Sequence, residues 1–302
     1  MKPVKIGYFA DGIWGRNAFK LIHQDESFSI KFLCLRFKTP DSTLKQLAES
    51  SGIDVIIEDN VNCPHFIKKV KQYECDIFVS MSFDQIFKKD IIDIPRMGII
   101  NCHAGKLPFY RGKTVLSWAL INDEKEFGIT VHQVDEGIDT GDIILQKTYP
   151  ISDADDYGTL LSLAQIECAK VLHEALCMIC QIGGGGGIVP QTNQKSIHSV
   201  GMYCGTRKEG DEIINWNSSS RELFCFVRAL AKPAVMAKSF LNGKDFLINK
   251  ASMVTNAPIY KGIPGQILYK DDGKLIVKTK DSILRLEEYF HDGIVKIGDR
   301  LN

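Results

Sequence analysis

Asn101 and His103 carry the side chains in this sequence that are best suited to chemistry. They are separated by one residue, so in an extended segment both side chains point to the same side. They follow an apolar run, Met97 to Ile100, that we expect to be a buried strand. Because open α/β sheets bind ligands beyond the carboxyl ends of their strands, this position predicts an active site.

Asp139 is the carboxylate that we expect to complete this site. It lies in a glycine-rich turn, residues 136–141, between two strand-like runs, Gly128 to Val134 and Ile143 to Lys147. Two strands joined by this turn could bring Asp139 back beside His103, giving a carboxylate–imidazole pair for general acid–base work, which the sequence alone allows but does not show. His132, in the first of these runs, is interpreted as a structural histidine or a partner of the site.

Three separated motifs together resemble one known family. They are Asn101-x-His103, then Leu107-Pro108-x-Tyr110-Arg111-Gly112, then Asp139-x-Gly141. In order, spacing and residue type they are similar to the formyltransferases that use 10-formyltetrahydrofolate, over roughly the first 180 residues. This family includes glycinamide ribonucleotide, methionyl-tRNA and nucleotide-sugar N-formyltransferases. The resemblance implies attack of a primary amine on the formyl carbon through a tetrahedral oxyanion.

The resemblance also implies a role for each nominated residue. Asn101 would donate to the oxyanion, His103 would relay a proton or act as a second donor, and Asp139 would orient and charge the imidazole. The implied neighbours of the folate are Met81, Phe83, Asp84, Ile86, Asp135, Gly137 and Ile138. For Met81, Phe83 and Ile86 the alternative is that they only close the core. The carboxylates beside Asp139 are also interpreted as capping or solvating the turn.

The acceptor is predicted from the segment Tyr110 to Trp118, which resembles the nucleotide-sugar enzymes. The expected substrate is an amino-deoxysugar on a nucleoside diphosphate, thymidine diphosphate by preference, used for O-antigen or lipopolysaccharide biosynthesis. The candidate contacts are Trp14, Tyr110, Arg111, Lys113, Tyr203, Arg207, Trp216 and Arg228. For Arg111 the alternative is that it buttresses a loop by hydrogen bonds to carbonyls. Some of the others could equally be surface or packing residues.

Three other functions stay open beside this one. Methionyl-tRNA formyltransferase is the alternative within the family, and a basic stripe on one face would favour it. A catalytically silent folate- or nucleotide-binding protein would bind without turnover, and a hydrolase would use water as the nucleophile. Walker, Gly-x-Ser-x-Gly and His-Glu-x-x-His motifs do not occur, which argues against P-loop, serine hydrolase and zinc protease chemistry.

Composition indicates a neutral protein of more than one domain. The chain has 302 residues, with 37 Lys and Arg against 37 Asp and Glu, and this balance argues against nucleic acid as a partner. Its nine scattered cysteines are typical of reduced thiols, and neither a leader nor an apolar run of membrane-spanning length is expected. We therefore expect a cytoplasmic protein without a metal. The expected assembly, which composition does not determine, is a homodimer. Cys177-Met-Ile-Cys180 is interpreted as helix packing.

The fold class is predicted from the alternation of strands and helices. It favours an α/β, Rossmann-like, mostly parallel sheet with helices on both faces, plus a small C-terminal β-rich domain. The expected domains are a catalytic domain over residues 1–187, a linker and helix completing the acceptor site over 188–258, and a β domain over 259–302. A GxGxxG fingerprint is missing, and the run Gly183 to Gly187 is interpreted as a helix stop.

The individual elements follow from periodicity and turn residues. The expected strands are Val4 to Ala10, Phe28 to Leu35, Val55 to Ile57 and Asp76 to Met81, with short strands again after Lys261. The first expected helix follows a loop, Asp11 to Gly15, and ends at Ile22. The other expected helices are Ser42 to Ser51, Cys63 to Tyr73, Gly112 to Leu120, Asp156 to Ile182 and Ser220 to Ala231.

Overall fold

The protein was analysed as a computed structural model, which describes residues 2–183 and 190–302. The chain divides into two compact units. The first comprises Met1–Gly112, Phe127–Tyr149 and Ser162–Tyr203, and the second comprises Lys113–Glu126, Pro150–Leu161 and Cys204–Asn302. The predicted boundaries after residues 187 and 258 stay predictions. Apart from Gly183, the predicted glycine helix stop lies outside the described residues.

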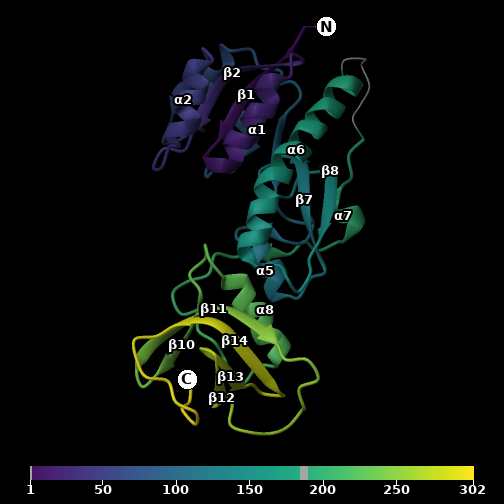
Figure 1. Ribbon diagram of the computed structural model, residues 1–302. Helices are drawn as coiled ribbons and strands as arrows, with labels where there is room; N and C mark the ends of the chain where they lie inside the picture. The colour runs from purple at the N-terminus through teal and green to yellow at the C-terminus, as the bar shows by residue number, and fades with distance from the viewer. Residues whose placement is uncertain (1, 184–189) are drawn as a thin grey trace. The chain divides into compact units, whose positions relative to one another are not determined.

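A seven-stranded sheet forms the centre of the first unit (Figure 1). Its order is β3-β2-β1-β4-β5-β7-β8; β1 to β5 pair in parallel, and β7 runs antiparallel to β5. The predicted mostly parallel sheet is therefore confirmed. The strands are β1 Val4–Ala10, β2 Phe28–Leu35, β3 Asp54–Ile57, β4 Ile77–Met81, β5 Ile99–His103, β7 Glu126–Gln133 and β8 Ile143–Pro150. A separate pair joins β6 Arg111–Gly112 to β9 Tyr203–Cys204.

The helices up to β9 connect these strands or follow them. They are α1 Gly12–Gln24, α2 Ser42–Ser50, α3 Pro64–Lys71, α4 Lys89–Ile92, α5 Val115–Ile121, α6 Tyr157–Gly183 and α7 Gln194–Ile197. Most lie within a few residues of their predicted bounds. The predicted loop from Asp11 to Gly15 is wrong, because α1 begins at Gly12 directly after β1. The carboxylate of Asp11 instead accepts the backbone N–H groups of Arg36 and Asp41, which ties the end of β1 to the segment after β2.

Aromatic side chains fill the core on one side of this sheet. Phe9 is fully buried and has its ring centroid 5.5 Å from Phe32, 5.3 Å from Phe78 and 5.1 Å from Phe87, in edge-on arrangements. Phe83, in the loop after β4, packs against Phe9 with centroids 5.5 Å apart. Aromatic pairs of this kind contribute about 0.5–1.5 kcal/mol beyond their burial. The aromatic cluster therefore holds the loop after β4 against the sheet.

The second unit contains α8 Ser220–Leu230 and a five-stranded antiparallel sheet, in agreement with the predicted C-terminal β structure. Its order is β10-β11-β14-β13-β12, with β10 Ala237–Leu241, β11 Lys244–Met253, β12 Ile267–Asp271, β13 Lys274–Lys278 and β14 Ile283–Phe290. The prediction missed β10 and β11. Their turn, Asn242-Gly243, has positive φ at both residues, as type I′ hairpin turns require.

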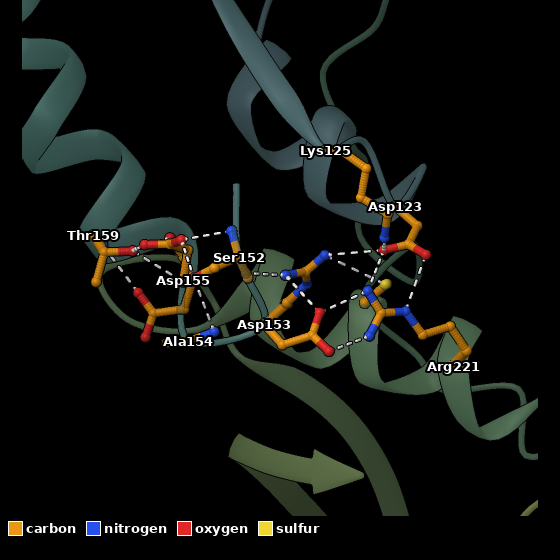
Figure 2. A network of polar contacts seen from close by, with 11 residues as sticks. Asp123, Lys125, Ser152, Asp153, Ala154, Asp155, Thr159 and Arg221 are labelled. Carbon is orange, nitrogen blue, oxygen red and sulfur yellow. Dashed lines mark hydrogen bonds and ion pairs between the residues drawn. The ribbon is translucent and has the colours of Figure 1, made fainter. Parts of the chain in front are cut away.

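Charged side chains in the second unit form a network around Asp123 (Figure 2). Its carboxylate accepts from Arg221 Nε at 3.0 Å and from Arg228 Nη2 at 3.3 Å, and Arg228 Nη1 also donates to the carbonyl of Ser152 at 2.8 Å. The hydrogen bonds from Arg221 hold the pKa of Asp123 well below its usual range. Arg228, predicted as a substrate contact, is 5% exposed and is engaged in this network. In the part of the chain that the structure describes, no helix is long and apolar enough to span a bilayer.

Candidate active site

The two predicted strand-end residues lie opposite β7. In the antiparallel register of β5 and β7, Asn101 pairs with His132 and His103 pairs with Thr130. Cys102, between them, is buried on the other side, where its Sγ contacts the carbonyl of Cys168 on α6. The one-residue spacing of Asn101 and His103 thus places both side chains toward the turn between β7 and β8, as the sequence predicts.

His103 and Asp139 come together as expected. His103 Nδ1 lies 3.6 Å from Asp139 Oδ2, and both side chains are almost buried, 10% and 13% exposed. The other ring nitrogen, Nε2, is 2.6 Å from the carbonyl oxygen of Tyr110. A carbonyl can only accept, so Nε2 carries the proton in neutral His103 and the lone pair of Nδ1 faces Asp139. This tautomer leaves Nδ1 as the atom that can take up a proton.

His132 is a second imidazole on the same carboxylate, which favours the partner alternative over a purely structural one. Its Nε2 lies 3.4 Å from Asp139 Oδ1, and its Nδ1 donates to the carbonyl of Gln133 at 2.7 Å. The Nε2 of the neutral ring therefore accepts the hydrogen bond from Asn101 Nδ2 at 3.3 Å. This bond fixes the orientation of the Asn101 amide and uses only one of its two N–H groups.

Opposing effects set the charge of Asp139. Burial raises its pKa, but His103 and His132 in their protonated forms, together with the backbone N–H of Gly112, which donates at 2.8 Å, hold the pKa well below its usual range. Asp139 has φ +53°, in the left-handed region that non-glycine residues seldom adopt. A strained backbone and a stabilised carboxylate at the same residue are typical of functional sites.

Gly105 allows the close approach between His103 and the carbonyl of Tyr110. A Cβ at this position would lie 2.4 Å from His103 Nε2 and 2.4 Å from the Tyr110 oxygen, closer than atoms can pack. The carbonyl of Gly105 accepts from Thr130 Oγ1 at 2.7 Å, and Thr130 is fully buried. Neither Gly105 nor Thr130 was predicted as a site residue. Thr130 lies near the site because it pairs with His103 in the sheet.

Gln194 links the two loops that surround the site. Its Oε1 accepts from Arg111 Nε at 3.1 Å and Nη2 at 2.6 Å, and its Nε2 donates to the carbonyls of Asp139 at 2.9 Å and Gly141 at 2.8 Å. Gln194 is 2% exposed and Arg111 9%. Arg111 also lies over the ring of Tyr203. This supports the loop-buttress alternative for Arg111 in place of the predicted substrate contact.

The predicted folate neighbours fall into two groups. Met81 is buried in β4 and Phe83 packs in the aromatic core, so both fit the alternative of core closure. Ile86 and Ile138 are 57% and 49% exposed; Ile138 precedes Asp139 in the chain, and Ile86 lies in the loop after β4. Asp84, Asp135 and Gly137 are also exposed, and Asp135 caps the turn by accepting from Gly137 N at 3.0 Å and from Thr140.

The predicted acceptor contacts are scattered. In the first unit, Trp14 is half-buried in the first turn of α1 and Tyr203 is 56% exposed, whereas Tyr110 is buried. In the second unit, Lys113 is exposed.

Two further nominees in the second unit are engaged in the fold. Trp216 is 5% exposed and its indole donates to Ser239 Oγ at 3.0 Å, which gives it a packing role. Arg207 Nη1 donates to Ser117 Oγ at 2.5 Å, and burial lowers its pKa. Like Arg228, these side chains have partners inside their own unit, which the sequence could not reveal.

Comparison with known proteins agrees with this geometry. Residues 35–176 match the formyl transferase family model, and residues 207–294 match the model of the formyl transferase C-terminal domain. The methionyl-tRNA formyltransferase of Thermodesulfovibrio yellowstonii is 34% identical over 243 residues, 80% of this chain and 74% of the relative. That of Caldanaerobacter subterraneus subsp. tengcongensis is 34% identical over 267 residues, 87% of this chain and 82% of the relative.

A solved structure extends the likeness to the fold. The N-formyltransferase from Helicobacter canadensis, in complex with folinic acid and dTDP-3-aminofucose, superposes with a TM-score of 0.67 at 21% identity, over 95% of this chain and 100% of that chain. At this identity the likeness concerns the fold alone. The sequence relatives at 30–34% identity are methionyl-tRNA formyltransferases, and they overturn the predicted sugar acceptor and its place in surface-glycan biosynthesis.

Proposed function

Because the chain belongs to the formyl transferase family, we propose that it transfers the formyl group of 10-formyltetrahydrofolate to the amine of methionyl-tRNA. The observation that carries the choice of acceptor is the set of methionyl-tRNA formyltransferases at 30–34% identity, each aligned over 80% or more of this chain. The sequence had favoured a partner other than nucleic acid, and this proposal replaces that expectation.

The donor set of the site suits this reaction. One N–H of the Asn101 amide donates to His132 Nε2. The second N–H is therefore the donor for the oxygen of the formyl group as negative charge develops there. Ile86 and Ile138 are exposed apolar side chains, which suit contact with a flat pteridine ring. Asn101, with these two side chains, would hold the formyl donor.

His103 and Asp139 handle the proton in this proposal. The amine nitrogen bonds to the formyl carbon, a proton leaves the amine for His103 Nδ1, and the bond from the formyl carbon to the folate nitrogen breaks. The negative charge of Asp139, whose Oδ2 lies 3.6 Å from Nδ1, stabilises the imidazolium that forms. His103 then returns the proton to the leaving nitrogen. General acid–base help of this kind is worth about 10²- to 10⁴-fold in rate.

The distribution of charge supports a tRNA acceptor despite the neutral total. Between Arg207 and Asn302 the chain has sixteen Lys and Arg residues against twelve Asp and Glu, so the balancing acidic excess lies in residues 1–206. Exposed lysines on the C-terminal strands include Lys244, Lys250, Lys270 and Lys274. The net basic charge of this segment is what supports phosphate-backbone contacts.

The proposal is tested by offering two kinds of acceptor to the purified protein. With 10-formyltetrahydrofolate and charged initiator tRNA, mass spectrometry of the released aminoacyl-adenosine should show a gain of one formyl group on methionine. A parallel reaction with nucleotide-linked aminosugars should leave the sugars unmodified. Formylated sugar with unmodified methionyl-tRNA would refute the assigned acceptor, whereas formate release in both reactions would indicate a hydrolase.

A further inference from the structure

Three side chains able to bind metal meet in the first unit, on parts of the chain that the active site does not use. Asp25 ends α1, while His173 and Cys177 lie one turn apart on α6. Asp25 Oδ2 is 2.9 Å from His173 Nε2 and 3.9 Å from Cys177 Sγ, and the same sulfur is 3.9 Å from His173 Nε2. All three ligand atoms lie within 4.8 Å of one another.

We propose that Asp25, His173 and Cys177 form a binding site for one divalent transition-metal ion, with zinc the best match. Carboxylate, imidazole and thiolate are all zinc ligands. The negative charges of the Asp25 carboxylate and the Cys177 thiolate balance a divalent cation, while the imidazole of His173 is neutral. The sequence reasoning considered only the Cys177–Cys180 pair. The signal it missed is the His173-x-x-x-Cys177 spacing, which places both side chains on the same helix face.

The distances fit a tetrahedral ion with small movements. Zinc bonds of about 2.0–2.3 Å at a tetrahedral angle require roughly 3.4 Å between the nitrogen and oxygen ligands and roughly 3.6 Å from sulfur to either. The observed 2.9 Å and 3.9 Å each differ from these values by half an ångström or less. Cys177 Sγ is also 3.9 Å from His173 Nδ1, so binding further requires the imidazole to turn until its Nε2 lone pair points at the shared ion.

The surroundings hold two of the ligands in place. Asp25 Oδ1 accepts the backbone N–H of Ser27 at 2.9 Å, which leaves Oδ2 directed at His173 and Cys177. The ring of His173 packs edge-on against Phe28, with centroids 5.8 Å apart. Hydrogen bonds and packing around the ligands are characteristic of built metal sites. A bound ion would tie α6 to the end of α1.

A nucleophilic role for Cys177 is the weaker interpretation of the same cluster. Burial and the neighbouring carboxylate of Asp25 raise the pKa of its thiol, so the reactive thiolate is disfavoured without a metal. A cation has the opposite effect, because it displaces the thiol proton and neutralises the repulsion between thiolate and carboxylate. Cys180 is half-buried one turn further along α6 and lies outside the group of three ligand atoms within 4.8 Å of one another.

Cobalt titration of the reduced full-length protein tests the site. We expect one Co²⁺ per chain, with a thiolate-to-cobalt charge-transfer band and the visible bands of tetrahedral cobalt, all abolished by one equivalent of Zn²⁺. Cys177→Ser should remove the charge-transfer band, and Asp25→Asn, which keeps the shape of the side chain and its bond to Ser27, should weaken binding at least about tenfold. Cys180→Ser tells whether sulfur or water completes the site.

Cys63→Ser is the matched control. Cys63 caps α3 by accepting from Phe66 N, a position that serine fills well, so this variant loses a thiol without losing the cap. It should bind Co²⁺ like the wild type. Failure of the wild-type protein to develop the band, or binding unchanged in both Cys177→Ser and Asp25→Asn, would overturn the proposal. Circular dichroism confirms folding of each variant, and the result is independent of formyl transfer.

Discussion

Gln194→Ala tests whether the buried amide positions Asp139. The substitution removes two hydrogen bonds from Arg111 and two to the carbonyls of Asp139 and Gly141. A hydrogen bond to a charged group is worth about 1.5–3 kcal/mol and a neutral one about 0.5–1.5 kcal/mol. Water entering the space left by the side chain restores part of this. We therefore expect a loss of about 3 kcal/mol in the free energy of unfolding.

The same substitution should lower turnover. Asp139 has a left-handed backbone that Gln194 helps to hold, so its carboxylate is expected to move relative to His103. A displacement near 1 Å costs up to about 10²-fold in rate. We expect kcat for methionyl-tRNA to fall by about 10- to 100-fold with little change in KM for the folate, measured by initial rates, while urea denaturation gives the stability.

Gln194→Glu separates the hydrogen bonds that Gln194 accepts from Arg111 from those that it donates to the backbone carbonyls. A carboxylate still accepts from Arg111 but cannot donate to the carbonyls of Asp139 and Gly141, so activity should fall although Arg111 stays paired. Gln191→Ala, an exposed residue of the same segment, is the control and should resemble the wild type. A loss below about 1 kcal/mol together with wild-type kcat in Gln194→Ala would refute the reasoning.

Three further predictions concern other parts of the chain. Gly105→Ala should break the bond between His103 Nε2 and the carbonyl of Tyr110 and lower kcat at least about tenfold, because the tautomer of the imidazole is no longer fixed; initial rates with circular dichroism as a folding check decide this. Asp123→Ala should cost about 2 kcal/mol of stability at pH 7, because buried Arg228 loses a partner. Because folding lowers the pKa of Asp123, its contribution to stability is fully present above the unfolded-state pKa near 4 and is lost as the pH falls below about 4. The difference in unfolding free energy between wild type and variant should therefore shrink at acidic pH. Urea denaturation at several pH values that gave a constant difference would contradict this. Lys270→Glu should weaken tRNA binding and flatten its salt dependence by about one unit of slope, and filter binding that shows an unchanged slope would exclude Lys270 from the tRNA contact.

Local signals explain why much of the first unit could be predicted. The strands β1 and β2 are mostly apolar, although Lys5 lies in β1 and Ser29 and Lys31 lie in β2; polar turns bound both, and their bounds agree with the prediction. Asn101 and His103 could be nominated because a two-residue period determines on which side of a strand a residue lies. Asp139 needed the family motif, since the turn that returns it to His103 is set by contacts with Gly112 and Gln194.

The parts that were missed depend on contacts between distant segments. Gln194 lies 55 residues from Asp139 in the chain, and an isolated glutamine in a polar segment has no distinguishing pattern. Arg111 and Trp216 looked like ligand contacts because the sequence cannot show that Gln194 and Ser239 satisfy them internally. The hairpin of β10 and β11 is different, because its Asn242-Gly243 turn was a readable signal.

Formation of formyl-methionyl-tRNA in a single turnover, by the wild-type protein and by Asp139→Asn, tests the central claim most directly. We expect that the wild type forms the product and that the variant, folded by circular dichroism, forms it about 10²- to 10⁴-fold more slowly, because His103 loses the carboxylate that stabilises its charge. Product formation by Asp139→Asn at the wild-type rate, or none by the wild type, would contradict it.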